Sequence, residues 1–250
     1  MTLADVWFVL VAALLAGYAV LDGFDLGAGV LYPFLGRNDE QKAAIRNAIG
    51  PVWDGNEVFL IAGGGALFAA FPPVYAMTFR GFYLAIMLFL FGLIFRAVSL
   101  EFRHRDEKWA RVWDAGFFVG SLLPALLAGV ALGNVIRGVP LDANGDYMGT
   151  FLELLNPYSL LVGVTGLVLF VTHGAAWLAY KTEGDLHRRA SRARAVGFIA
   201  FAALAVASTA VTFVAVPRAS DNVVGSAAGW AFIVVLVAAL LYPLWQIRAT

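Results

Sequence analysis

The amino-acid sequence predicts an all-α protein that crosses a lipid membrane several times as a polytopic helix bundle. Hydrophobic residues make up 61% of the chain and charged residues only 14%, whereas a soluble domain is about one-quarter charged. Seven apolar stretches are long enough to span a bilayer, which takes about 20 residues. They cover residues 6–32, 51–72, 77–99, 112–136, 157–180, 195–216 and 227–247.

These stretches are expected to be helices because lipid cannot hydrogen-bond an open backbone. A membrane β-barrel would instead show alternating segments of about ten residues. The first stretch lacks the basic segment of a signal peptide and runs to about Tyr32, so we expect it to be a retained span. The loops at 137–156 and 181–194 are too short for a further domain, and residues 1–250 are predicted to form a single transmembrane domain.

Composition also excludes several classes of function. The formal net charge is zero, so nothing indicates a nucleic-acid partner. The chain has no cysteine, which excludes disulfides, thiolate metal sites and iron–sulfur clusters.

The distribution of Lys and Arg predicts that the N-terminus lies outside the cytoplasm. With that orientation, 14 of the 17 basic residues fall in cytoplasmic segments, and only Arg80, Arg137 and Arg218 lie on the outer side. This asymmetry is typical of multi-pass membrane proteins, whose cytoplasmic loops are enriched in positive charge.

Ionisable residues inside membrane spans are costly and indicate a functional site. The apolar stretches contain Asp22, Asp25, Asp54, Glu57, Arg96 and Asp114. Their spacing of three places Asp22 and Asp25 on one helix face. Asp54 and Glu57 share a face of the second stretch for the same reason. The predicted orientation gathers all six residues in the cytoplasmic half of the membrane.

Two interpretations of these residues remain open. In the structural one, Asp54 interacts with a helix dipole, Asp25 pairs with Arg96, and Asp114 belongs to a structural ion pair. In the other, the residues form a proton path, because five carboxylates share one arginine and burial favours a protonated carboxyl group. Asn56 can hydrogen-bond the waters of such a path. The candidate proton path comprises Asp54, Glu57, Asn56, Asp25 and Asp22. The candidates for a structural ion pair are Arg96 and Asp114.

The histidines argue against a haem or metal held by this chain. His173 is the only histidine in a predicted span, whereas His104 and His187 lie among arginines in cytoplasmic loops and are expected to be solvated. A haem with two histidine ligands needs a second one at matching depth. Met77 and Met87 can serve as axial ligands, but methionine in an apolar helix usually packs against its neighbours.

Three pairs of glycines four residues apart allow helices to approach closely. They are Gly23 with Gly27, Gly116 with Gly120, and Gly129 with Gly133. Packing between helices of this chain is the favoured explanation, and packing against a partner subunit is the alternative.

A series of short motifs makes the sequence recognisable. The motifs are DGFDLG (22–27), LGRND (35–39), WDGNEV (53–58), GGALFAAFP (64–72), FR (95–96), WD (113–114), GN (133–134), GVP (138–140) and LLNP (154–157). In order and spacing this series resembles subunit II of cytochrome bd-type ubiquinol oxidase. The resemblance extends over residues 1–190 and is only compositional from about residue 195.

The resemblance implies a haem-free subunit of a bacterial inner-membrane respiratory enzyme. In that family, subunit I carries haem b and haem d, and the complex oxidises quinol and reduces oxygen to water with cytoplasmic protons, without pumping. Subunit II is implied to stabilise subunit I and to supply protons from the aspartate matching Asp54. Some members hold a structural quinone. The resemblance leaves open whether the complex has a small third subunit. This chain is therefore not expected to be catalytic alone.

The resemblance also implies two four-helix bundles and a peripheral helix. We expect the first bundle over 1–136 and an incomplete second bundle over 157–250, because the family usually has further spans at the C-terminal end. Two other functions remain open. A proton-coupled secondary transporter would place its acids near the membrane midplane, and a purely structural assembly subunit would need no titratable path.

Overall fold

The computed structural model describes residues 2–103, 105, 107–143 and 145–249, and nearly all of them lie in helices. The helices are α1 (Leu3–Leu35), α2 (Asp39–Ile49), α3 (Trp53–Ala70), α4 (Pro72–Gly81), α5 (Tyr83–Phe102), α6 (Ala110–Arg137), α7 (Phe151–Leu154), α8 (Pro157–Lys181), α9 (Gly184–Ala215), α10 (Pro217–Val224) and α11 (Ala227–Ala249). A 3₁₀ turn at Glu107–Trp109 precedes α6. The predicted all-α bundle is confirmed.

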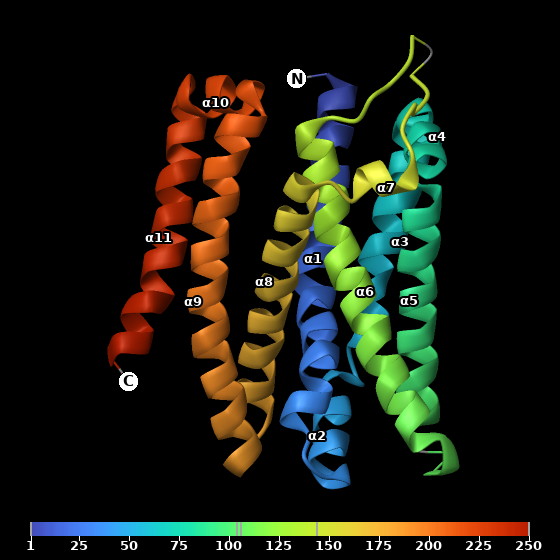
Figure 1. The fold of residues 1–250 in the computed structure, drawn as a ribbon, viewed down its shortest axis with the longest axis vertical. Helices are drawn as coiled ribbons and strands as arrows, with labels where there is room; N and C mark the ends of the chain where they lie inside the picture. Colours follow the sequence, from blue (N-terminus) through green and yellow to red (C-terminus); the bar gives the residue numbers. More distant parts are fainter. Residues whose placement is uncertain (1, 104, 106, 144, 250) are drawn as a thin grey trace.

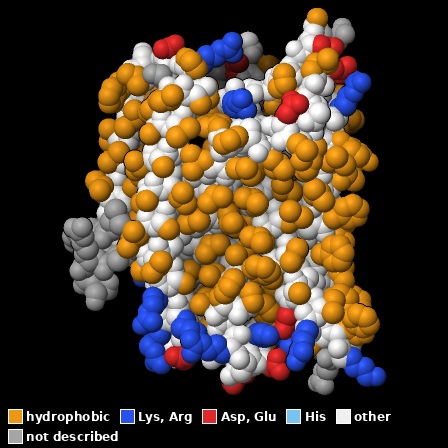
Figure 2. Space-filling view, viewed as in Figure 1, with side chains coloured by type: hydrophobic (Ala, Val, Ile, Leu, Met, Phe, Trp, Pro, Cys, Tyr) orange, Lys and Arg blue, Asp and Glu red, His pale blue; other side chains and the backbone are white. Residues whose placement is uncertain are grey.

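The long helices run alternately up and down and lie roughly parallel (Figure 1). The short helix α2 and the α8–α9 turn lie at one end of the bundle, called the α2 end below. The N-terminus, α4, α7 and α10 lie at the other end. Lys and Arg side chains gather at the α2 end, and hydrophobic side chains cover the middle (Figure 2). This is the asymmetry that a membrane-spanning bundle requires.

Within the part of the chain that the structure describes, five helices are long and apolar enough to cross a membrane: α1, α5, α6, α8 and α9. Each of the two remaining predicted stretches also coincides with a helix, α3 or α11. Asp54, Asn56 and Glu57 lower the hydropathy of α3, and the apolar part of α11 covers 229–241 among the residues whose side chains the structure describes. The count of seven spans therefore stays a prediction.

Two boundaries differ from the sequence prediction. Residues 77–99 were expected to form one span, but 77–81 belong to α4 and the long helix begins only at Tyr83. Two prolines start α4, and the backbone at Phe82 leaves the helical region between α4 and α5. The amphipathic helix α2 was not predicted. Its N-terminus is capped by Asn38, whose side chain accepts a hydrogen bond from the backbone nitrogen of Gln41 at 2.8 Å.

Close helix contacts build the bundle around α1, which packs against α3, α6 and α8. The predicted glycine pairs lie at such contacts within the chain. A Cβ atom added to Gly27 would lie 1.8 Å from the carbonyl oxygen of Phe170 on α8. One added to Gly120 would lie 2.6 Å from the backbone nitrogen of Arg96 on α5, and one on Gly129 would lie 2.8 Å from Cα of Gly163. Packing between helices of this chain explains these glycines.

The helix α8 also packs against both α1 and α6, and α9 packs against α8. Trp177 on α8 donates a hydrogen bond from Nε1 to the backbone oxygen of Ala48 on α2, at 3.0 Å. Residues before and after the 138–150 loop therefore share one packed interior. The division into a first bundle over 1–136 and a second over 157–250 stays a prediction.

Candidate functional site

Asp22 and Asp25 lie on the inner face of α1, and neither side chain is exposed. The spacing of one helical turn predicted this shared face, and the central position of α1 buries it. Arg96, also fully buried, reaches across from α5 and donates a hydrogen bond from Nη2 to Oδ1 of Asp22 at 2.7 Å. The bundle thus holds a charge-assisted ion pair between two helices in its interior.

A second carboxylate shares the same guanidinium group. Oε1 of Glu57 on α3 lies 3.1 Å from Nη2 of Arg96, and the Glu57 side chain is 20% exposed. The ring of Trp53, one turn earlier on α3, lies 5.9 Å from the guanidinium carbon. Arg96 therefore joins α1, α3 and α5 at one point.

The expected pairing of Asp25 with Arg96 is wrong. Asp25 accepts a hydrogen bond at Oδ2 from Nδ2 of Asn56 at 2.7 Å, and the same amide donates to the backbone oxygen of Leu21 at 3.1 Å. Asp22, one turn away on α1, forms the ion pair with Arg96 instead. A buried amide, rather than a cation, is thus the polar neighbour of Asp25.

Several buried polar atoms of this cluster have no hydrogen-bond partner among the described residues. They are Oδ2 of Asp22, Oδ1 of Asp25, Nε and Nη1 of Arg96, and Oγ of Ser99. Oε1 of Glu57 has its ion-pair contact with Arg96 but no hydrogen bond to a described residue. Buried polar groups in folded proteins are almost always hydrogen-bonded, either to protein or to ordered water. The arrangement accordingly suits a cluster that binds internal water.

Asp54 occupies a different environment from the rest of the predicted path. It is exposed in the first turn of α3, one turn nearer the α2 end than Glu57. The structure therefore brings Asp22, Asp25, Asn56 and Glu57 together around Arg96 and leaves Asp54 at the surface beside them. Exposed Asp54 and half-buried Glu57 therefore lie on consecutive turns of α3.

Asp114 forms a second cluster, separate from Arg96. Its carboxylate contacts Nζ of Lys42 at 2.7 Å and Nε of Arg103 at 2.6 Å. Tyr32 donates a hydrogen bond to the same carboxylate at 2.6 Å and accepts one from Arg46 at 2.5 Å. Sequence reasoning placed Asp114 among the ion-paired residues but missed Tyr32, since no pattern marks a tyrosine as a hydrogen-bond bridge.

Arg103, beyond the end of α5, stays charged in this cluster. Partial burial opposes its charge, but the hydrogen bond and the attraction from Asp114 outweigh this effect and raise the pKa of Arg103. Its Nη2 also contacts Oδ1 of Asp39 at 2.9 Å. The cluster thereby ties α2 to the ends of α5 and α6.

His173 lies in an aromatic environment. The ring of His173 packs edge-to-face against Phe24 at 5.5 Å, and Trp177 stacks on the same phenylalanine. Met77 on α4 and Met87 on α5 lie on helices that are not beside α8 (Figure 1). The residues around His173 therefore do not fit a haem with two axial ligands. His104 lies outside the described residues.

Fold and site together define a multi-pass membrane protein that holds ionisable residues between its helices. The family model of cytochrome bd terminal oxidase subunit II matches residues 3–250, and the chain belongs to this family.

Known relatives agree with this assignment. Cytochrome bd-I ubiquinol oxidase subunit 2 of Escherichia coli K12 is 48% identical over 190 residues, covering 74% of this chain and 50% of the relative. Cytochrome bd ubiquinol oxidase subunit 2 of Bacillus subtilis is 41% identical over 217 residues, covering 83% of this chain and 64% of the relative. The chain thus spans about half to two-thirds of the length of these relatives.

The fold is similar to a chain in the solved structure of bd oxidase from Geobacillus thermodenitrificans, with a TM-score of 0.74. That alignment covers 96% of this chain and 76% of the other, at 18% sequence identity. At this level of identity the likeness concerns the arrangement of helices alone.

Proposed function

We propose that this chain is the haem-free subunit II of a quinol-oxidising, oxygen-reducing bd-type oxidase in a bacterial inner membrane. Its N-terminus lies outside, and the α2 end faces the cytoplasm. The haem b and haem d of the enzyme belong to subunit I, which this chain stabilises. Support comes from family membership, from the basic α2 end, and from a His173 whose ring is packed among aromatic side chains.

The proposal assigns the chain a second task, which is to carry cytoplasmic protons toward the site of oxygen reduction. The observation behind it is the buried cluster, in which Arg96 contacts Asp22 and Glu57, while the side-chain partner of Asp25 is the neutral amide of Asn56. An ionised carboxylate in a protein interior needs compensating partners. Three carboxylates cannot all find them in one guanidinium group, so the cluster favours bound protons.

The route begins at Asp54, which is exposed at the α2 end. It continues to Glu57 on the next turn of α3, whose side chain is partly exposed. From there the Arg96 cluster leads to Asp22 and Asp25, and Asn56 holds Asp25 in place. Waters bound to the unpartnered oxygen atoms complete the hydrogen-bonded chain along which protons move.

The substitution Asp54→Asn tests this route. It keeps the size of the side chain but removes the proton that can be exchanged. We expect slower oxygen consumption by the assembled oxidase, by about tenfold or more, with unchanged haem spectra. The control Glu40→Gln removes an exposed carboxyl group from α2 at the same end and leaves turnover unchanged. Full turnover in Asp54→Asn would reject the route and leave the purely structural function.

A further inference from the structure

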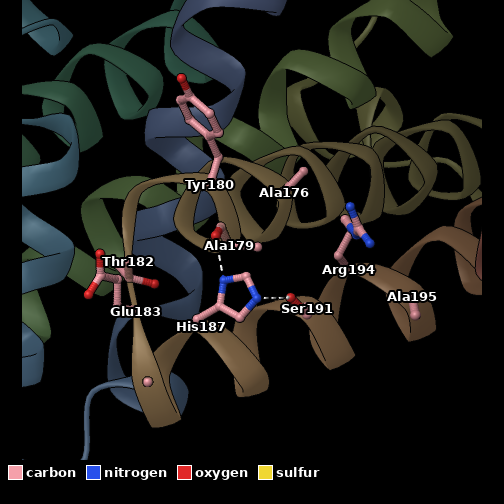
Figure 3. A pocket seen from close by; sticks show the side chains of 10 residues that line it. Ala176, Ala179, Tyr180, Thr182, Glu183, His187, Ser191, Arg194 and Ala195 are labelled. Atoms are coloured by element: carbon pink, nitrogen blue, oxygen red, sulfur yellow. Dashed lines mark hydrogen bonds between the residues drawn. The ribbon is translucent and has the colours of Figure 1, made fainter. Parts of the chain in front are cut away.

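The α8–α9 hairpin forms an open groove at the α2 end, apart from the carboxylate cluster. The groove has a volume of about 1000 Å³. Its lining residues from α8 are small or aromatic, and α9 contributes polar and basic side chains together with Gly184 and Ala195 (Figure 3). Ala176, Ala179 and Ala195 supply the apolar part of the lining, while His187, Ser191 and Arg194 supply its polar part.

The polar side is built on one face of α9. His187, Ser191 and Arg194 are spaced by four and three residues, so their side chains follow the same stripe toward α8. The His187 ring is fixed because its Nδ1 lies 2.7 Å from the backbone oxygen of Ala179, which can only accept a hydrogen bond. Nδ1 therefore carries a hydrogen, and Nε2 is directed toward Ser191, whose Oγ lies 3.5 Å away.

The histidine contact links α9 to α8 beside the groove. Ala179 lies in the last turn of α8, where carbonyl groups lack a helical donor. His187 supplies that donor from the next helix. The contact joins the end of α8 to the start of α9. Ser191 and Arg194, further along α9, make no such contact with the described residues of α8.

Charge favours an anion in the groove. Arg194 is exposed and forms no ion pair or hydrogen bond with another described residue. By contrast, Arg188 and Arg189 are both paired with Asp185 on the same helix. The acidic lining residue, Glu183, points away from Arg194 (Figure 3). An unpaired guanidinium group one helical turn from a serine hydroxyl offers the kind of donors that bind phosphate.

The surroundings identify the source of that phosphate as lipid. Beyond Arg194, α9 presents large apolar side chains such as Val196, Ile199 and Val206, which are 63%, 54% and 64% exposed. Nζ of Lys181 lies 4.9 Å from the ring of Trp177, an arrangement found where a helix reaches the membrane surface. The groove therefore lies beside the start of an apolar helix surface, at the level expected for lipid headgroups.

We propose that this groove binds the headgroup of an anionic phospholipid, with Arg194 and Ser191 on the phosphate and one acyl chain along the alanine lining. Basic pockets between membrane helices on the cytoplasmic side commonly hold such headgroups. The proposal does not depend on the proton route, because none of its residues belongs to the carboxylate cluster.

Native mass spectrometry of the full chain in detergent tests the proposal. The chain is titrated with phosphatidylglycerol, with phosphatidylcholine, and with phosphatidylglycerol in the presence of inorganic phosphate. We expect one phosphatidylglycerol to bind more tightly than phosphatidylcholine, without displacement by millimolar phosphate. Arg194→Gln should weaken this binding about fivefold, as expected for one cation at the membrane surface. Arg192→Gln makes the same charge change outside the groove and should leave it unchanged.

A second variant tests the shape of the groove without changing its charge. Ala195→Leu keeps every charge but fills the apolar part of the groove, and it should also weaken phosphatidylglycerol binding. Equal effects of Arg194→Gln and Arg192→Gln would show only unspecific attraction to a basic surface and would overturn the proposal. Equal affinity for phosphatidylcholine, displacement by inorganic phosphate, or no bound lipid would overturn it as well.

Discussion

Arg96 determines the charge balance of the buried cluster. Among the described residues it is the cation in contact with both Asp22 and Glu57, and its side chain is fully buried. Removing one partner of a buried ion pair leaves an uncompensated charge, which costs far more than losing an exposed pair. The three helices that meet at Arg96 consequently depend on one guanidinium group.

We predict that Arg96→Gln lowers stability strongly, by about 3–5 kcal/mol. The matched control is Arg80→Gln, which breaks an ion pair with Asp146 whose side chains are 72% and 40% exposed. That change should cost about 0–1 kcal/mol. The Tm of both variants in detergent, measured against the unchanged chain, checks the difference. Equal Tm values for the two variants would show that the Arg96 pair contributes no more than an exposed one.

The sequence could predict which residues enter the cluster but not how they pair. The spacing of three placed Asp22 and Asp25 on one face, and the orientation placed Arg96 at a similar depth. Which aspartate meets the arginine depends on the rotation and depth of α5 against α1, and a difference of one helical turn decides it. The contact between Asn56 and Asp25 depends in the same way on the packing of α3.

At the level of elements, hydropathy predicted the long helices well. An apolar segment in lipid must satisfy its own backbone hydrogen bonds, so it forms a helix. It missed α2 since an amphipathic helix at the membrane surface has no long apolar run. It also merged part of α4 with α5, because both are apolar and only the backbone at Phe82 separates them. Local turns depend on contacts that hydropathy does not register.

Glycine contacts at the α1–α8 interface give a prediction at this scale. Gly27→Ala places a methyl group where the carbonyl oxygen of Phe170 lies, so the two helices must move apart. We expect a loss of about 1–3 kcal/mol, measured as a lower Tm in detergent. Gly64→Ala is the control, because no atom lies within 4 Å of the added methyl group. It should be neutral or stabilise α3 by up to about 1 kcal/mol, and an equal loss at both positions would contradict the packing described.

The whole molecule combines a basic end, an apolar middle and a polar cluster between its helices. The basic end was predictable from the distribution of Lys and Arg, and family membership from short motifs over residues 1–190. The groove between α8 and α9 was not predictable, because it depends on how two helices meet at their turn. The chain spans about half the length of its Escherichia coli relative.

The assignment as an oxidase subunit is tested most directly by what co-purifies with the chain. A tagged chain is expressed in its native membrane, solubilised gently and purified, and the reduced-minus-oxidised absorption spectrum of the product is recorded. We predict the bands of haem b and haem d together with a second, multi-span polypeptide on a gel. A chain that purifies alone and without colour would contradict the assignment and direct attention to proton-coupled transport.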